Sequence, residues 1–191
     1  MKVGVLALQG AFREHAEVLT ALGTQVRLVR TPAALADVDA LVLPGGESTT
    51  IGMLLRSSQL GEPLRAALRA GMPALATCAG LIVCASTILD GRPDQVPLGV
   101  LDVAVRRNGY GRQRDSFEAS LDIDGVGAFS GVFIRAPKIE SVGSAVTVLA
   151  SVGEQPVLVR QGALWGATFH PELSGDPRLH QAFLEAAAAG R

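Results

Sequence analysis

The first half of the chain alternates apolar runs with helical patterns, and this alternation constrains the fold more than any other feature. Apolar runs of strand length lie at residues 3–8, 25–30, 40–43 and 73–76. Helical patterns follow them at 12–22, 50–55, 62–70 and 81–85. Strands that alternate with helices form βαβ units, in which the strands pair in parallel. The first half therefore predicts an α/β fold with a parallel sheet.

The second half changes character. Short β segments separated by Gly, Asp and Pro lie at 100–105, 117–121, 132–134, 146–152, 156–161 and 164–168, and a helix is expected at 177–189. Such spacing is typical of antiparallel hairpins added to a parallel core. The length of 191 residues, of which 48% are hydrophobic, suits one domain spanning residues 1–191.

Charge and cysteine content exclude several classes of protein. The formal net charge of -1 lacks the excess of positive charge that binding to nucleic acid or an anionic membrane requires. We see no apolar run of membrane-spanning length, and the N-terminus enters a strand pattern without a cleavage site, so we expect a cytoplasmic protein. The two cysteines, Cys78 and Cys84, have neither disulfide nor zinc spacing, which fits a reducing compartment.

Cys78 lies in the segment Ala-Thr-Cys-Ala-Gly-Leu-Ile at 76–82, between a predicted buried strand and a predicted helix. A sharp strand-to-helix turn is where α/β hydrolytic enzymes expose a nucleophile at the edge of the sheet. The alternative is a small hydrophobic residue of the core, which is the usual place of a free cysteine and the one we expect for Cys84. Cys78 acts as a nucleophile only if the fold supplies a base and an oxyanion site.

The segment Leu-Pro-Gly-Gly-Glu-Ser-Thr-Thr at 43–50 follows one strand and precedes a helix. Paired glycines let the backbone turn sharply and present N–H groups. The segment lacks the Gly-Lys-Ser/Thr ending of a phosphate-binding P-loop. A backbone donor from this loop, together with the N–H of Ala79, would form an oxyanion hole. The alternative is that Gly45 and Gly46 form only a turn, with Ser48 as an N-cap.

His170 and Glu172 follow the last predicted strand, in Thr-Phe-His-Pro-Glu at 168–172. Histidine is the usual base beside a cysteine nucleophile, and a carboxylate can orient its ring. The fold must bring this pair to Cys78, which lies far away in the chain. His15 and His180 fall within predicted helices, and we expect both at the helix surface.

The chain resembles the class I, triad-type glutamine amidotransferases in three motifs, at 44–50, 77–82 and 168–172. Within that class, the segments 8–15, 107–108, 111–113, 116–118 and 131–137 are similar to the family of glutaminase subunits of pyridoxal 5'-phosphate synthase. The resemblance spans about residues 3–173. It implies a three-layer, flavodoxin-like fold, with a mixed, mostly parallel sheet flanked by helices and with added antiparallel strands.

The resemblance also implies roles for individual residues. Cys78 would attack the side-chain amide of glutamine, and His170 and Glu172 would complete the triad. The implied glutamine-binding residues are Gly46, Glu47, Ser48, Arg107, Ile134 and Arg135. Gly46 and Ala79 would form the oxyanion hole, and Gln9 would couple it to a partner. No metal or cofactor is implied for this chain.

The implied partner is a synthase subunit that makes pyridoxal 5'-phosphate from ribose 5-phosphate and glyceraldehyde 3-phosphate, using ammonia from this chain. Two alternatives stay open: a glutaminase subunit of another complex, such as imidazole glycerol phosphate synthase, and a non-catalytic binding module. Two departures from the family pattern are Ala76, where glycine is usual, and Tyr110, where phenylalanine is common. We expect the extra methyl of Ala76 to be accommodated.

Overall fold

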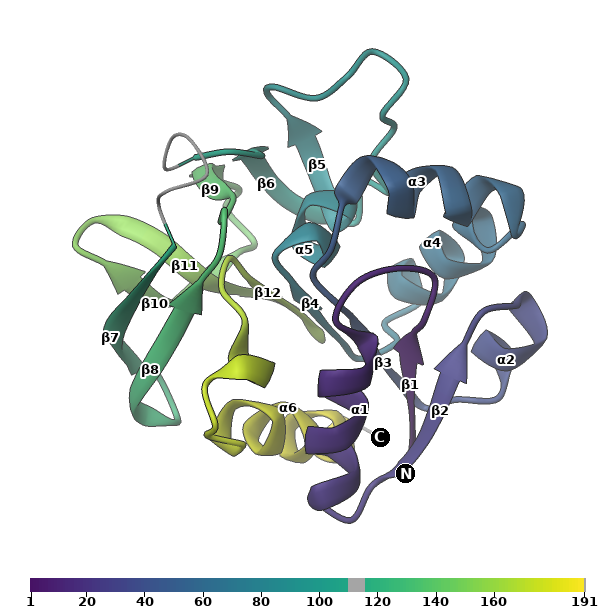
Figure 1. Ribbon diagram of the computed structural model, residues 1–191, viewed down its shortest axis with the longest axis horizontal. Coiled ribbons are helices and arrows are strands. Elements are labelled where there is room, and N and C mark those ends of the chain that lie inside the picture. Colours follow the sequence, from purple (N-terminus) through teal and green to yellow (C-terminus); the bar gives the residue numbers. More distant parts are fainter. Residues whose placement is uncertain (110–115, 191) are drawn as a thin grey trace.

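A single seven-stranded sheet organises the structure, a computed structural model that describes residues 1–109 and 116–190 (Figure 1). Its strand order is β10-β11-β12-β4-β3-β1-β2. Five neighbouring strands run parallel: β2 (Gln25–Val29), β1 (Lys2–Leu6), β3 (Ala40–Leu43), β4 (Ala74–Thr77) and β12 (Leu164–Ala167). The strands β11 (Gln155–Gln161) and β10 (Thr147–Val152) extend the sheet by antiparallel pairing. The predicted α/β fold with a mixed, mostly parallel sheet is confirmed.

Helices cover both faces of the sheet (Figure 1). One face carries α2 (Pro32–Ala36), α3 (Ser48–Ser57), α4 (Gly61–Arg69) and α5 (Ala79–Cys84), which pack on strand residues such as Leu41 and Leu43. The other face carries α1 (Phe12–Ala21) and α6 (Arg178–Ala189), which pack on Ala40 and Val42. Successive residues of β3 thus serve opposite cores, as the period of two in a strand requires. Within the described ranges, no helix is long and apolar enough to cross a membrane.

The added β segments form two smaller units beside the main sheet. The strands β7 (Phe117–Ile123) and β8 (Gly127–Phe133) make the predicted antiparallel hairpin. The strands β5 (Ala85–Ile88), β6 (Leu101–Arg106) and β9 (Lys138–Val142) form a three-stranded sheet. The sequence patterns missed β5, β9 and the short helix α2. Unlike the equally short but fully buried β3 and β4, β5 and β9 each hold a single buried residue, so they lack an apolar run. The five residues of α2 make fewer than two helical turns.

The topology brings the predicted site segments to one edge of the sheet. In the parallel strands, Leu43 of β3 pairs with Ala76 of β4, and Thr77 of β4 pairs with Ala167 of β12. The segments that follow β3, β4 and β12 therefore leave the sheet side by side. This carboxyl edge is where open α/β sheets bind ligands.

Candidate active site

Cys78 occupies the sharp turn between β4 and α5 that the sequence predicted. Its backbone has φ 47° and ψ -105°, a left-handed conformation that is rare for a residue with a side chain. The turn is held because the Cys78 N–H donates to the carbonyl of Ala167 at 2.8 Å. Behind it, Gly80 passes so close to the carbonyl oxygen of Leu43 that a β-carbon would collide with it. Close packing of α5 on β3 thus keeps the sulfur at the end of the sheet.

Ala76 stands in β4 where the family pattern has glycine. The residue is fully buried in β4 and pairs across the sheet with Gly166 of β12. Paired residues of neighbouring strands point to the same face of a sheet. Leu81 and Leu101 fill the space that a side chain on Gly166 would need, so β12 carries glycine opposite Ala76.

His170 and Glu172 form a buried pair at the end of β12. The Nδ1 atom of His170 lies 2.8 Å from Oε1 of Glu172, and both residues are 7% exposed. Burial by itself lowers the pKa of His170. Hydrogen bonds to Cys78 and Glu172, together with the negative charges of these groups, outweigh burial and raise that pKa to about 10. The ring therefore links the sulfur to the carboxylate, and these neighbours favour its protonated form.

A cavity of about 430 Å³ opens beside Cys78 and His170. Most of the predicted site residues line it: Gln9, Gly46, Glu47, Ser48, Cys78, Arg107, Ile134, Arg135 and His170. Glu172 and Ala79 do not line it, since Glu172 lies behind the His170 ring and Ala79 is 1% exposed. Ile82 and Asn108 complete the lining. Among the described residues, no group of three His, Cys, Asp or Glu could hold a metal ion.

Gly45 and Gly46 allow close approach between the loops and do more than form a turn. A β-carbon on Gly45 would lie 2.5 Å from Cε1 of His170 and 3.2 Å from Cβ of Cys78. A β-carbon on Gly46 would collide with the side-chain oxygen of Gln9. That oxygen accepts the Glu47 N–H at 2.7 Å, so Gln9 fixes the loop at the mouth of the cavity.

Glu47 caps α3 and also lines the cavity. Its carboxylate accepts the backbone N–H groups of Thr49 at 3.2 Å and Thr50 at 2.8 Å. Partial burial raises the pKa of Glu47, but the hydrogen bonds from Thr50 and Thr49 outweigh it and lower the pKa overall. The alternative of Ser48 as the N-cap is wrong, because Ser48 is already the first residue of the helix.

Gln95 joins the site although no sequence motif marks it. Its side chain accepts from Nη1 of Arg107 at 2.8 Å and donates to Oγ of Ser48 at 2.9 Å. Arg107 also lies 3.8 Å from the Glu47 carboxylate. Gln95 therefore ties two cavity walls that are far apart in the chain. No local pattern marks an isolated glutamine in a loop.

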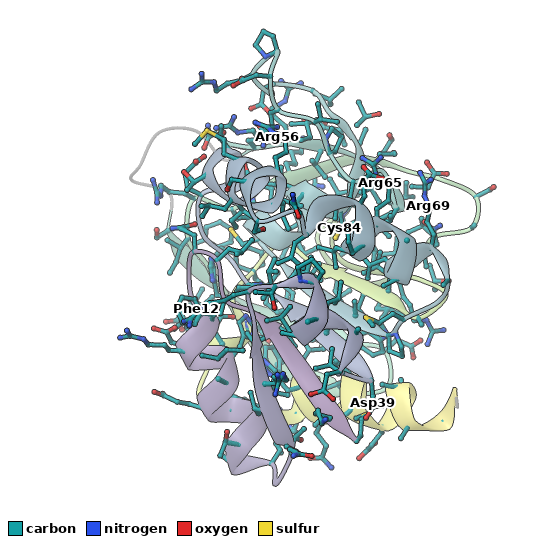
Figure 2. The ribbon with its side chains drawn as sticks, turned by 90° about the vertical axis from the view of Figure 1, so that its right-hand side faces the viewer. Phe12, Asp39, Arg56, Arg65, Arg69 and Cys84 are labelled. Carbon is teal, nitrogen blue, oxygen red and sulfur yellow. The ribbon has the colours of Figure 1, made fainter. Side chains whose placement is uncertain are left out.

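Two arginines, one on α3 and one on α4, hold the loop that carries Gln95. Arg56 of α3 donates to the carbonyl of Asp94 at 3.2 Å, and Arg65 of α4 donates to the carbonyl of Pro97 at 3.3 Å. Figure 2 shows Arg56 and Arg65 on the side of the molecule that carries α3 and α4. The loop therefore packs against α3 and α4 on both sides of Gln95.

Ile134 and Arg135 supply another part of the cavity wall, directly after β8. Arg135 has φ 44°, so this wall, like the Cys78 turn, carries a side chain on left-handed backbone. Tyr110 and the segment 111–113, which the family pattern singled out, lie outside the described residues.

The predictions for the remaining cysteine and histidines had different outcomes. Cys84 is fully buried, and burial raises its pKa to about 12, so its assignment to the core is confirmed (Figure 2). The surface placement of His15 and His180 is wrong, because both are fully buried. His15 shares the buried face of α1 with Leu19, and His180 shares that of α6 with Phe183. These spacings of four and three residues are typical of the buried face of a helix and could have predicted the burial of both histidines.

Known proteins resemble this chain over nearly its whole length. The model of the SNO glutamine amidotransferase family matches residues 5–189. A protein of Frankia alni named pyridoxal 5'-phosphate synthase subunit PdxT is 58% identical, covering 96% of this chain and 94% of that protein. One of the same name from Thermus thermophilus is 55% identical, with 97% of each chain covered.

A solved structure agrees with these sequence relationships. It is described as a crystal structure of glutamine amidotransferase and superimposes with a TM-score of 0.93 at 51% identity, covering 97% of this chain and 98% of that one. The shared sequence, the shared fold and the Cys78, His170 and Glu172 arrangement point the same way. The chain belongs to the SNO glutamine amidotransferase family.

Proposed function

We propose that this protein is the glutaminase subunit of a pyridoxal 5'-phosphate synthase, which hydrolyses L-glutamine to L-glutamate and ammonia. The observation that carries the proposal is the meeting of Cys78 and His170 at the cavity, with Glu172 behind the ring. The relatives named pyridoxal 5'-phosphate synthase subunit PdxT support the choice of complex.

The first half-reaction forms a thioester. The Cys78 thiolate attacks the side-chain amide carbon of glutamine, giving a tetrahedral intermediate with a negative oxygen. The backbone N–H groups of Gly46 and Ala79 stabilise that oxygen; one such donor is typically worth about 2.7–4 kcal/mol in the transition state. When the C–N bond breaks, the protonated ring of His170 gives its proton to the leaving nitrogen. The products are ammonia and a γ-glutamyl thioester on Cys78.

The second half-reaction restores the enzyme. His170, now neutral, takes a proton from water as the water oxygen attacks the thioester carbon. The C–S bond then breaks and the new γ-carboxyl group loses its proton to solvent. The products are glutamate, the Cys78 thiolate and a protonated His170. Glu172 accepts the hydrogen bond from Nδ1 throughout, which keeps Nε2 directed at the reacting atoms.

Two charged residues of the cavity lining suit the amino-acid group of glutamine. Free glutamine carries a carboxylate and an ammonium, and the cavity offers the guanidinium of Arg107 and the carboxylate of Glu47. A planar guanidinium binds a carboxylate through two parallel hydrogen bonds. Ser48, Ile134 and Arg135 complete the proposed binding site.

Ammonia release calls for a partner. Near neutral pH most free ammonia becomes ammonium, which is no longer a nucleophile. Transfer within a sealed complex avoids this loss, so the ammonia passes to the synthase subunit that builds pyridoxal 5'-phosphate from ribose 5-phosphate and glyceraldehyde 3-phosphate. Gln9 couples docking to the oxyanion site, because its side chain holds the Glu47 N–H beside Gly46. We place this chemistry in the cytoplasm, where a free thiol stays reduced.

Glutamate release, measured with and without the synthase subunit, tests the proposal. We expect the synthase to stimulate the wild-type rate. Cys78→Ala and His170→Asn should abolish it, and Cys84→Ala, the matched control at the other cysteine, should keep it. No glutamate release with the synthase present, or full activity in Cys78→Ala, would reject the proposal.

A further inference from the structure

A chain of buried polar side chains continues behind the proposed triad. The first oxygen of Glu172 faces His170, and the second, Oε2, lies 3.2 Å from Nε2 of His15. The same nitrogen lies 3.1 Å from Oγ1 of Thr77, and Nδ1 of His15 lies 2.9 Å from Nε2 of His180. The side chains of Glu172 and His15 are completely inaccessible to solvent.

These side chains come from four elements that are distant in the sequence. Thr77 ends β4, His15 belongs to α1, His180 to α6, and Glu172 to the short 3-10 helix at Pro171–Leu173. Burying four such polar groups costs free energy unless they satisfy one another. Packing of α1 and α6 on the sheet could be achieved by apolar residues alone, so the polar chain calls for another explanation.

Both buried histidines are neutral at neutral pH. Burial lowers the pKa of His15 well below its usual range, and the neighbouring His180 and His170 lower it further. Burial also lowers the pKa of His180 to about 4. Each neutral ring carries one N–H and one bare nitrogen, so the chain has a direction that depends on the tautomers.

One pair of tautomers fits the surroundings better than the other. If Nε2 of His15 carries the hydrogen, it donates to Oγ1 of Thr77 and lies 3.2 Å from Oε2 of Glu172, and Nδ1 accepts from Nε2–H of His180. Nδ1 of His180, which is buried without a hydrogen-bond partner among the described residues, is then only a bare acceptor. In the reverse arrangement, a lone pair would face the carboxylate and a buried N–H would have no partner. An unsatisfied buried donor of this kind costs about 1–3 kcal/mol.

The contact between His15 and Glu172 is electrostatic and is not a well-aligned hydrogen bond. The 3.2 Å separation is within ion-pair distance, but Oε2 has no contact of full hydrogen-bond geometry among the described residues. The electrostatic stabilisation of Oε2 of Glu172 therefore comes from the neighbouring Nε2–H of His15. Loss of that hydrogen would leave one oxygen of a buried carboxylate facing no donor.

We propose that His15 is a positioning residue that holds the second oxygen of Glu172, and that His180 selects the tautomer of His15 needed for it. With both oxygens held, the carboxylate keeps its orientation toward Nδ1 of His170. His15 touches neither substrate nor sulfur, so its effect passes through Glu172. The inference rests on the proposed glutaminase activity.

Two substitutions of His15 separate its two nitrogens. The amide nitrogen of His15→Gln lies as many bonds from Cβ as Nε2 does, so it keeps a donor for Glu172. The amide of His15→Asn reaches only the position of Nδ1 and leaves Oε2 without a donor. Leu19→Ala is the matched control, because Leu19 lies one turn further along the same buried face of α1.

Each variant is measured in the complex with the synthase subunit, as kcat and KM for glutamine, with thermal unfolding alongside. We expect His15→Asn to lose about tenfold in kcat, because the electrostatic contact that holds Oε2 of Glu172 is lost. Its KM stays unchanged because the cavity does not include His15. His15→Gln recovers most of kcat, and Leu19→Ala lowers the unfolding temperature without lowering kcat.

The outcomes separate this inference from the proposed function. An inactive wild-type complex rejects the glutaminase proposal. In that case, the rate at which iodoacetamide alkylates Cys78 in the isolated chain at pH 6 still compares the variants. A folded His15→Asn with wild-type kcat, or an equal loss in His15→Gln and Leu19→Ala, overturns the role of His15. If His15→Asn does not fold, His180→Phe takes its place, since it keeps His15 but removes the hydrogen that selects its tautomer. An unchanged kcat in that variant overturns the proposal.

Discussion

Gly45→Ala introduces one methyl group where the triad leaves no space. The new carbon would lie 2.5 Å from Cε1 of His170 and 3.2 Å from Cβ of Cys78. Carbon atoms normally pack at about 3.5–4.0 Å, so the ring or the loop must move by about 1 Å. A misplacement of about 1 Å can cost about a hundredfold in rate, and overpacking of this kind destabilises a fold by about 1–3 kcal/mol. We expect Gly45→Ala to lower kcat by about a hundredfold.

Gly52→Ala is the matched control for this prediction. Gly52 lies within α3, and a β-carbon there would meet no atom within 4 Å. Alanine is favoured over glycine in a helix by up to about 1 kcal/mol, so this variant should be slightly more stable and fully active. Glutamate release with the synthase subunit gives kcat, and urea unfolding gives the stability of each variant. Wild-type kcat in Gly45→Ala would refute the claim that contact with His170 requires glycine here.

Two further predictions concern residues outside the triad. Gln95→Leu should raise KM for glutamine by about tenfold with little change in kcat, because the Arg107 guanidinium loses its hydrogen bond to Gln95 and keeps only the longer contacts to Thr49 and Glu47. An unchanged KM in steady-state assays would contradict this. Stability should fall as the pH drops from about 6.5 to about 4, because the unfolded chain binds a proton at His180 that the folded chain resists. The gap corresponds to about 3 kcal/mol for this histidine. Urea unfolding at several pH values should show a shallower slope in His180→Phe, and an identical slope would contradict the assignment.

The alternation of strands and helices was predictable because each of those elements has a periodic apolar pattern of its own. The turn at Cys78 could also be predicted, because a buried strand runs directly into a helix there. β5 and α2 could not, because β5 has a single buried residue and α2 makes fewer than two helical turns, so neither shows an apolar pattern. Strand order was not readable either, since it depends on pairing between distant segments.

The sequence by itself determined the chemistry of the proposed triad: a cysteine on a strand-to-helix turn, and a histidine and a glutamate directly after a strand. Only the tertiary structure decided which other side chains surround them. Gln95 and His15 carry no local signal of their roles, because a hydrogen bond across the fold depends on distance in space, which local patterns do not encode. His15 and His180 illustrate this most clearly: each stands in an ordinary helical pattern, yet packing of α1 and α6 on one sheet face brings their rings within 2.9 Å, behind Glu172.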